Sequence, residues 1–85
     1  MTREQIFNVF KELIYEHSYV VSRDVEINMD SRVVADLNID SLDRVNIVIA
    51  AEKAFDIELD DDAVATFPTI EDFVNLIEKK CNAKK

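Results

Sequence analysis

One serine, Ser41, lies among carboxylates in a stretch that reads DLNIDSLDR over residues 36–44. A serine hydroxyl can act as a nucleophile, carry a covalent group or cap a helix. As a nucleophile it needs a base, usually histidine, and a site that stabilises an oxyanion. The single histidine, His17, is distant in the sequence, and Ser41 is not in a G-x-S-x-G turn. The sequence therefore argues against a serine hydrolase.

A calcium loop is a second possibility for the same stretch. Asp36, Asn38 and Asp40 occupy the first, third and fifth positions of the D-x-[DN]-x-[DN]-G pattern. The glycine expected next is Ser41, and the bidentate glutamate expected at position twelve is Ile47. Without the sharp turn and the main chelating ligand, specific calcium binding is disfavoured. A divalent-metal-binding protein that uses Asp36, Asn38 and Asp40 remains one alternative.

The overall composition is that of one small folded domain. The chain has 85 residues, which predicts a single domain over 1–85, and 48% of them are hydrophobic. No apolar run reaches 18 residues, so we expect no membrane span. The N-terminal residues lack the pattern of a signal peptide, and the single cysteine, Cys81, permits no internal disulfide. We therefore expect a reducing, cytoplasmic location.

The net charge of −8 is concentrated around and beyond Ser41. Residues 36–62 contain nine acids and two bases, which gives a net charge of −7. Such a surface repels nucleic acid and attracts basic protein surfaces. One alternative is therefore an unmodified acidic helical interaction module that binds a basic partner. The absence of glycine also excludes the Gly-rich phosphate loops.

Helical spacing of apolar residues predicts an all-α fold. A capping box at Thr2 begins a helix over about 3–17, and a second helix covers about 41–55 with Ser41 as a possible N-cap. After Pro68, a second capping-box pattern at Thr69 begins a helix over about 70–81.

Two further segments complete the predicted fold. Asp60 or Asp61 can cap a short helix over about 62–66, and the long connection 18–40 carries apolar residues that we expect to pack on the core. The predicted architecture is a small antiparallel bundle of three main helices plus one short helix.

The arrangement D-L-x-x-D-S-L-D, followed by an apolar helix that ends in F-D-I-E, resembles the acyl carrier protein family over most of the chain. The resemblance implies a non-catalytic carrier with an acyl-carrier-like fold. Ser41 would bear a 4′-phosphopantetheine arm derived from coenzyme A. The thiol of the arm would hold acyl intermediates as thioesters for fatty-acid, lipid or polyketide-type synthesis. A separate phosphopantetheinyl transferase, or holo-carrier synthase, would attach the arm, so the carrier needs no base of its own.

The resemblance also implies partners and site residues. A monomer would serve acyl-transfer and condensing enzymes that have basic docking surfaces. Recognition by the transferase would involve Asp40, Leu42 and Asp43. The residues expected to contact partners are Asp36, Asp43, Arg44, Glu52, Asp56 and Glu58. The residues expected to line an acyl cavity between the helices are Val33, Val34, Val45, Val48, Ile49, Phe55, Val64 and Ile70.

The chain departs from the family pattern at several positions. Asn38 stands where the family usually has glycine, and asparagine tolerates a positive φ better than most residues. Asn46 stands where glutamate is common, and Arg44, Lys53 and Ala54 interrupt the acidic face of the second helix. These departures predict a dedicated carrier for a specialised lipid, polyketide or aminoacyl group, with partners unlike those of a general fatty-acid carrier.

Overall fold

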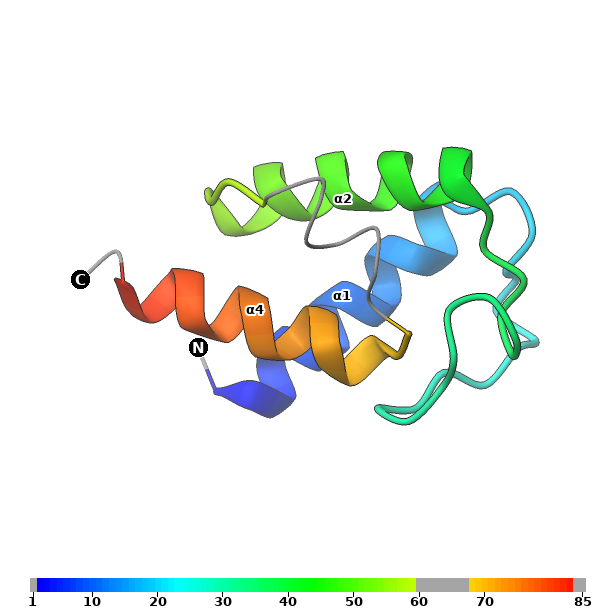
Figure 1. The fold of residues 1–85 in the computed structure, drawn as a ribbon, viewed down its shortest axis with the longest axis horizontal. Coiled ribbons are helices and arrows are strands. Elements are labelled where there is room, and N and C mark those ends of the chain that lie inside the picture. Colours follow the sequence, from blue (N-terminus) through cyan, green and yellow to red (C-terminus); the bar gives the residue numbers. More distant parts are fainter. Residues whose placement is uncertain (1, 60–67, 84–85) are drawn as a thin grey trace.

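Three helices form the frame of the protein, whose computed structural model describes residues 2–59 and 68–83. They are α1 (Arg3–His17), α2 (Ser41–Phe55) and α4 (Ile70–Ala83). Helix α1 contacts both of the others and runs in the opposite direction to them (Figure 1). The predicted all-α bundle is confirmed, and the described residues form no strand beyond one isolated bridge, Arg32 to Thr69. The predicted helix over 62–66 lies outside the described residues.

Helix α1 begins with the predicted capping box. The Thr2 hydroxyl accepts a hydrogen bond from the Gln5 amide at 3.1 Å, and the Gln5 side chain accepts one from the Thr2 amide at 2.8 Å. These two bonds satisfy donors that the first turn would otherwise leave unpaired. Ile6, Phe10 and Ile14 then recur at helical spacing and are all buried, so one face of α1 packs into the core.

Helix α2 ends in a left-handed turn that returns the chain to the core. Asp56 has a φ of 54°, and the Ile57 amide donates to the Glu52 carbonyl at 3.1 Å, which is the six-to-one bond of a Schellman motif. The Glu52 carboxylate also accepts a hydrogen bond from the Leu59 amide at 3.0 Å. As a result, Ile57 and Leu59 are buried directly after the helix.

Helix α4 begins at a polar cap and packs against α1. The Asp72 carboxylate accepts hydrogen bonds from the Thr69 amide at 3.2 Å and from the Thr69 hydroxyl at 3.0 Å. Phe73 stacks on Phe10 of α1 with ring centroids 5.2 Å apart. No described helix is long and apolar enough to cross a membrane.

The connection 18–40 packs on the core, as its apolar residues predicted. The buried hydrophobic residues of this segment are Val21, Ile27, Val33, Leu37 and Ile39, whereas Val20 and Val34 are exposed. The Tyr15 hydroxyl of α1 donates to the Val25 carbonyl at 2.6 Å. At the other end, Val33 donates to the Pro68 carbonyl at 2.9 Å and Ile70 donates to the Ser31 carbonyl at 3.0 Å. The connection is therefore fixed to both α1 and the start of α4, and it positions the start of α2.

Candidate functional site

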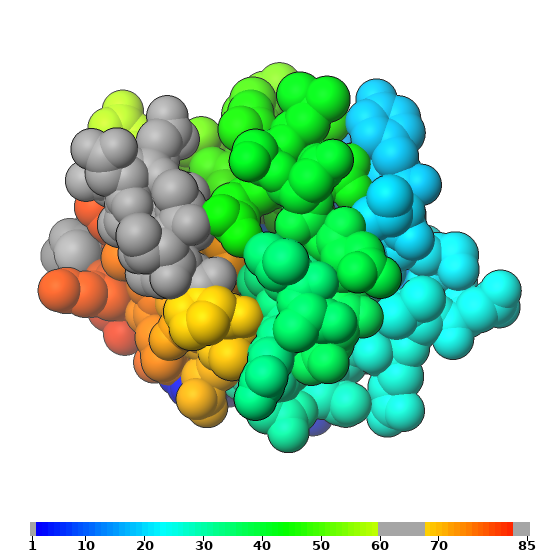
Figure 2. Space-filling view, turned by 45° about the vertical axis from the view of Figure 1, so that its right-hand side comes forward, coloured from blue at the N-terminus to red at the C-terminus, as the bar shows by residue number. Residues whose placement is uncertain are grey.

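Ser41 is the first residue of α2, and its side chain is exposed. No described residue forms a hydrogen bond with its hydroxyl. Figure 2 shows this face of the molecule, with the start of α2 in green above the blue-green residues 30–40. The Ser41 hydroxyl is therefore open to chemistry supplied by another molecule.

The cap of α2 is Asp40, so the interpretation of Ser41 as the N-cap is wrong. Asp40 has the extended backbone of a cap residue, with φ of −88° and ψ of −176°, and its side chain accepts a hydrogen bond from the Asp43 amide at 2.9 Å. Both residue types are good caps, and only the backbone geometry distinguishes them. Because Asp40 caps the helix, the Ser41 hydroxyl is not occupied by a capping hydrogen bond.

The first turn of α2 suits a phosphate group on Ser41. The amides of Ser41 and Leu42 have no acceptor among the described residues, because Asp40 pairs only with the amides of Asp43 and Arg44. Unpaired amides at a helix N-terminus, together with the positive end of the dipole, favour a phosphodiester. The residues present therefore fit the phosphate end of a phosphopantetheine arm.

Asp43 holds α2 to the end of α1. Its side chain is only 3% exposed, and its carboxylate accepts a hydrogen bond from the Ser18 hydroxyl at 2.8 Å and one from the Tyr19 amide at 3.3 Å. The sequence assigned Asp43 to recognition by partners and did not indicate this role. The two donors lie about two dozen positions earlier in the chain, so no local pattern could have revealed the contact.

The other two residues of the supposed calcium loop have structural surroundings of their own. The Asp36 carboxylate accepts a hydrogen bond from the Arg32 amide at 2.8 Å. Asn38 has a φ of 57°, so the prediction that asparagine replaces the family's glycine in a left-handed conformation is confirmed. Over residues 2–59 and 68–83, no group of three His, Cys, Asp or Glu side chains is arranged to hold a metal ion.

The remaining predicted partner residues lie mainly on the surface. Asp36, Asp56 and Glu58 are exposed, while Arg44 and Glu52 are half-buried. Leu42, with 68% of its side chain exposed, extends from the helix next to Ser41. Recognition of these residues by a partner remains a prediction.

The residues predicted to line an acyl cavity fall into two groups. Val33, Val48, Phe55 and Ile70 are buried, whereas Val34, Val45 and Ile49 are exposed, and Val64 lies outside the described residues. The interior beneath α2 contains a cavity of about 10 Å³. It is lined by Phe10, Ile14, Val33, Ile39, Arg44, Ile47, Ile70 and Phe73. An acyl chain could enter this space only if the helices moved apart, so the acyl cavity remains a prediction.

Comparison with known proteins agrees with the geometry around Ser41. A family described as "Phosphopantetheine attachment site" matches residues 19–77. The acyl carrier protein of Coprothermobacter proteolyticus is 36% identical over 84 residues, covering 99% of this chain and all of the relative. That of Prochlorococcus marinus is 40% identical over 80 residues, covering 94% of this chain and 98% of the relative. The chain therefore belongs to the acyl carrier protein family and is a non-catalytic carrier with a phosphopantetheine attachment site.

Proposed function

We propose that Ser41 is the residue that carries the 4′-phosphopantetheine arm. The observation that supports this assignment is an exposed hydroxyl at the first position of α2 that is not used for capping. The two unpaired amides of the same turn can donate hydrogen bonds to the oxygen atoms of the phosphate. The attraction of a helix N-terminus for an anion is about 0.3–1 kcal/mol, which is enough to orient the arm but not to bind it alone.

The attachment reaction uses Ser41 only as the nucleophile. Its Oγ forms a bond to the phosphorus next to pantetheine in coenzyme A, the pyrophosphate bond breaks, and the nucleotide portion leaves. The transferase takes the proton of the hydroxyl, since no described residue forms a hydrogen bond with the Ser41 hydroxyl that could accept it. The arm then ends in a thiol that forms thioesters with acyl groups, and this free thiol is suited to the reducing cytoplasm.

Acyl-transfer and condensing enzymes then dock on the exposed surface around Ser41. Leu42, Val45 and Ile49 give this surface an apolar centre, and the exposed acids Asp36 and Asp56 lie beyond its two ends. Basic docking surfaces on the partners would complement these acids. The carrier would meet these enzymes as a monomer, and nucleic acid would not be among its partners.

The charge of α2 favours a dedicated carrier over a general fatty-acid carrier. The acid at Asp43 is buried, so it adds little to the charged surface that a partner meets. Lys53 is exposed on the same helix, and Asn46 is neutral. The part of α2 that faces solvent is therefore less acidic than the sequence count suggests, and enzymes that select a strongly acidic helix would bind it weakly.

The assignment of Ser41 is tested by intact mass. The protein is incubated with coenzyme A, Mg²⁺ and a broad-specificity phosphopantetheinyl transferase, beside the variants Ser41→Ala and Ser22→Ala. Ser22 is another exposed serine, so it controls for nonspecific modification. We expect one added phosphopantetheine in the wild type and in Ser22→Ala, and none in Ser41→Ala. If several transferases leave the folded wild type unmodified, the unmodified interaction module becomes the better interpretation.

A further inference from the structure

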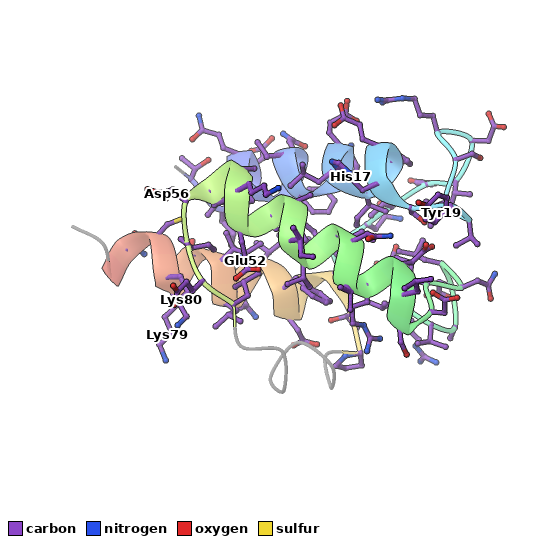
Figure 3. The ribbon with its side chains drawn as sticks, turned by 90° about the horizontal axis from the view of Figure 1, so that it is seen from above. His17, Tyr19, Glu52, Asp56, Lys79 and Lys80 are labelled. Carbon is purple, nitrogen blue, oxygen red and sulfur yellow. The ribbon has the colours of Figure 1, made fainter. Side chains whose placement is uncertain are left out.

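A groove of about 650 Å³ lies between the end of α1 and a face of α2 that does not point into the core. One wall consists of the last residues of α1 and the two residues that follow it, and the other wall is α2. Figure 3 shows His17 and Tyr19 along this side of α2, whereas Glu52 lies on the other side. Ala50 and Ala54 belong to the lining, and their small side chains leave space between the two walls. The groove therefore has room for a side chain of another molecule.

The groove carries one exposed charge on each wall. Glu16 at the end of α1 is exposed, and so is Lys53 on α2. No described residue forms a salt bridge with either side chain. With His17 neutral, these two charges cancel, whereas the whole chain has a net charge of −8. A molecule that complements the groove must therefore present both an acidic and a basic group.

Lys53 also sets the charge that α2 presents to solvent. Of the charged side chains of α2, all of which the structure describes, only Lys53 is exposed. Asp43 is buried, Arg44 and Glu52 are half-buried, and the Glu52 carboxylate accepts a hydrogen bond from the Leu59 amide. A docking surface with basic groups alone would place a cation against Lys53, and this contact between like charges disfavours such a partner.

Tyr19 and Ile49 supply the apolar surface of the groove. Tyr19 is 83% exposed and Ile49 is 45% exposed. Exposed aromatic and aliphatic side chains beside a concave surface are typical of sites that contact other proteins. Ile49 also belongs to the apolar centre that it forms with Leu42 and Val45 near Ser41. An interface of ordinary size, about 800 Å² per partner, can therefore cover both the groove and the surroundings of the arm.

The wall that bears Tyr19 is held in place by the protein itself. The Tyr19 amide donates to the Asp43 carboxylate at 3.3 Å, and the Ser18 hydroxyl donates to the same carboxylate at 2.8 Å. The Ser18 amide donates to the Ile14 carbonyl at 2.9 Å, so this wall continues directly from α1. Because the wall is already ordered, a partner that binds there loses less conformational entropy than one that must order a loop.

We propose that this groove is a docking site for a partner enzyme, and that the docking segment of this enzyme carries an apolar side chain between a carboxylate and a basic group. The apolar side chain would enter the groove between Tyr19 and Ile49. The carboxylate would pair with Lys53, and the basic group would pair with Glu16. The inference rests on the proposed function, because the enzyme acts on the arm at Ser41. The groove would select partners by excluding docking surfaces that are basic throughout.

Two designed helical peptides test the charge pattern. The mixed peptide presents glutamate, leucine and arginine on successive turns of one face, and the basic peptide has arginine in place of the glutamate. Titration followed by nuclear magnetic resonance gives both dissociation constants for the wild type, Lys53→Glu and Lys79→Glu. Lys79 is an exposed lysine of α4, so its replacement makes the same change in charge away from the groove. The ratio of the two constants removes the general attraction of an acidic chain for basic peptides.

We expect the mixed peptide to cause saturable chemical-shift changes at Tyr19, Ile49 and Lys53. Lys53→Glu should shift the ratio of the two dissociation constants about fivefold to tenfold in favour of the basic peptide, because one ion pair is lost and another is gained. Lys79→Glu should keep the ratio within about twofold of the wild type. The absence of saturable changes in the groove, or an equal shift of the ratio in the two variants, would overturn the proposal.

Tyr19→Ala and Val20→Ala test the apolar contact. Val20 is the next exposed residue and does not line the groove. Both substitutions keep the Tyr19 amide that donates to Asp43, so the wall keeps its position. We expect Tyr19→Ala to weaken binding of the mixed peptide about fivefold and Val20→Ala to change it by less than about twofold. Equal affinities of the two variants would contradict docking in the groove. The peptides bind without the arm, so this failure is distinct from a failure at Ser41, which appears as an absent gain in mass.

Discussion

Replacing the buried carboxylate of Asp43 should destabilise the protein far more than replacing an exposed acid. Asp43→Ala removes the acceptor for the Ser18 hydroxyl at 2.8 Å and for the Tyr19 amide at 3.3 Å. Asp24→Ala changes the net charge by the same amount at an exposed position, so it is the matched control. The comparison separates the structural role of Asp43 from the general effect of removing one acid from a chain of net charge −8.

The expected loss follows from the contacts. A hydrogen bond to an ionised group contributes about 1.5–3 kcal/mol, and the longer bond to Tyr19 belongs at the lower end of that range. The Ser18 hydroxyl keeps its role as acceptor for the amides of Val20 and Val21, which limits the damage. We expect a net loss of about 3 kcal/mol, out of a total of about 4–13 kcal/mol for a domain of this length.

Urea unfolding followed by circular dichroism measures this loss. With a slope of about 1 kcal/mol per molar urea, the midpoint of Asp43→Ala should fall by about 3 M, while Asp24→Ala stays within about 0.5 M of the wild type. Asp43→Asn, which keeps the size and one acceptor oxygen, should lie between them. Equal midpoints for Asp43→Ala and Asp24→Ala would refute the structural role of Asp43.

Three further outcomes follow from the same geometry. Asp40→Ala should lower the free energy of unfolding by about 1 kcal/mol, because Asp40 is the cap, while Ser41→Ala should change it by less than about 0.5 kcal/mol. The reverse order in urea unfolding would show that Ser41 is the cap instead. Asn38→Gly should leave the free energy of unfolding unchanged or raise it, whereas Asn38→Val should lower it by about 1–2 kcal/mol, because only valine resists a φ of 57°. Equal thermal midpoints for the two variants would argue against that conformation in solution. Asn46→Glu with Lys53→Glu should raise the kcat/KM of general fatty-acid loading enzymes about threefold to tenfold at low salt, an effect that added salt should reduce. No gain would remove the support for a dedicated partner set.

The sequence predicted the three helices because each has a strong local signal. The capping box at Thr2 and the apolar spacing of α1 act within a few residues, and the observed helix has the predicted bounds. The attachment motif is also local, so the position of Ser41 at the start of α2 was predictable. The conformation of Asn38 was predictable too, because only a few residue types tolerate a positive φ.

The rest of the site depends on contacts between distant residues. Nothing near Asp43 in the sequence indicates that its carboxylate is buried against Ser18, because the connection between them must fold first. Asp40 and Ser41 are both good cap residues, so the sequence leaves the choice between them open. The backbone conformation of Asp40 decides it. A groove beside α2 is lined by residues of α2 and by residues at and just after the end of α1, so it exists only in the folded chain.

The position of the arm is tested most directly by peptide mapping of the modified protein. Trypsin cleaves after Arg32 and Arg44, and the peptide over 33–44 contains Ser41 as its only hydroxyl-bearing side chain. After treatment with coenzyme A and a phosphopantetheinyl transferase, we expect this peptide alone to gain one phosphopantetheine. The gain should disappear in Ser41→Ala. A phosphopantetheine on any other peptide, or none on this one in a protein whose intact mass shows modification, would contradict the assignment of Ser41.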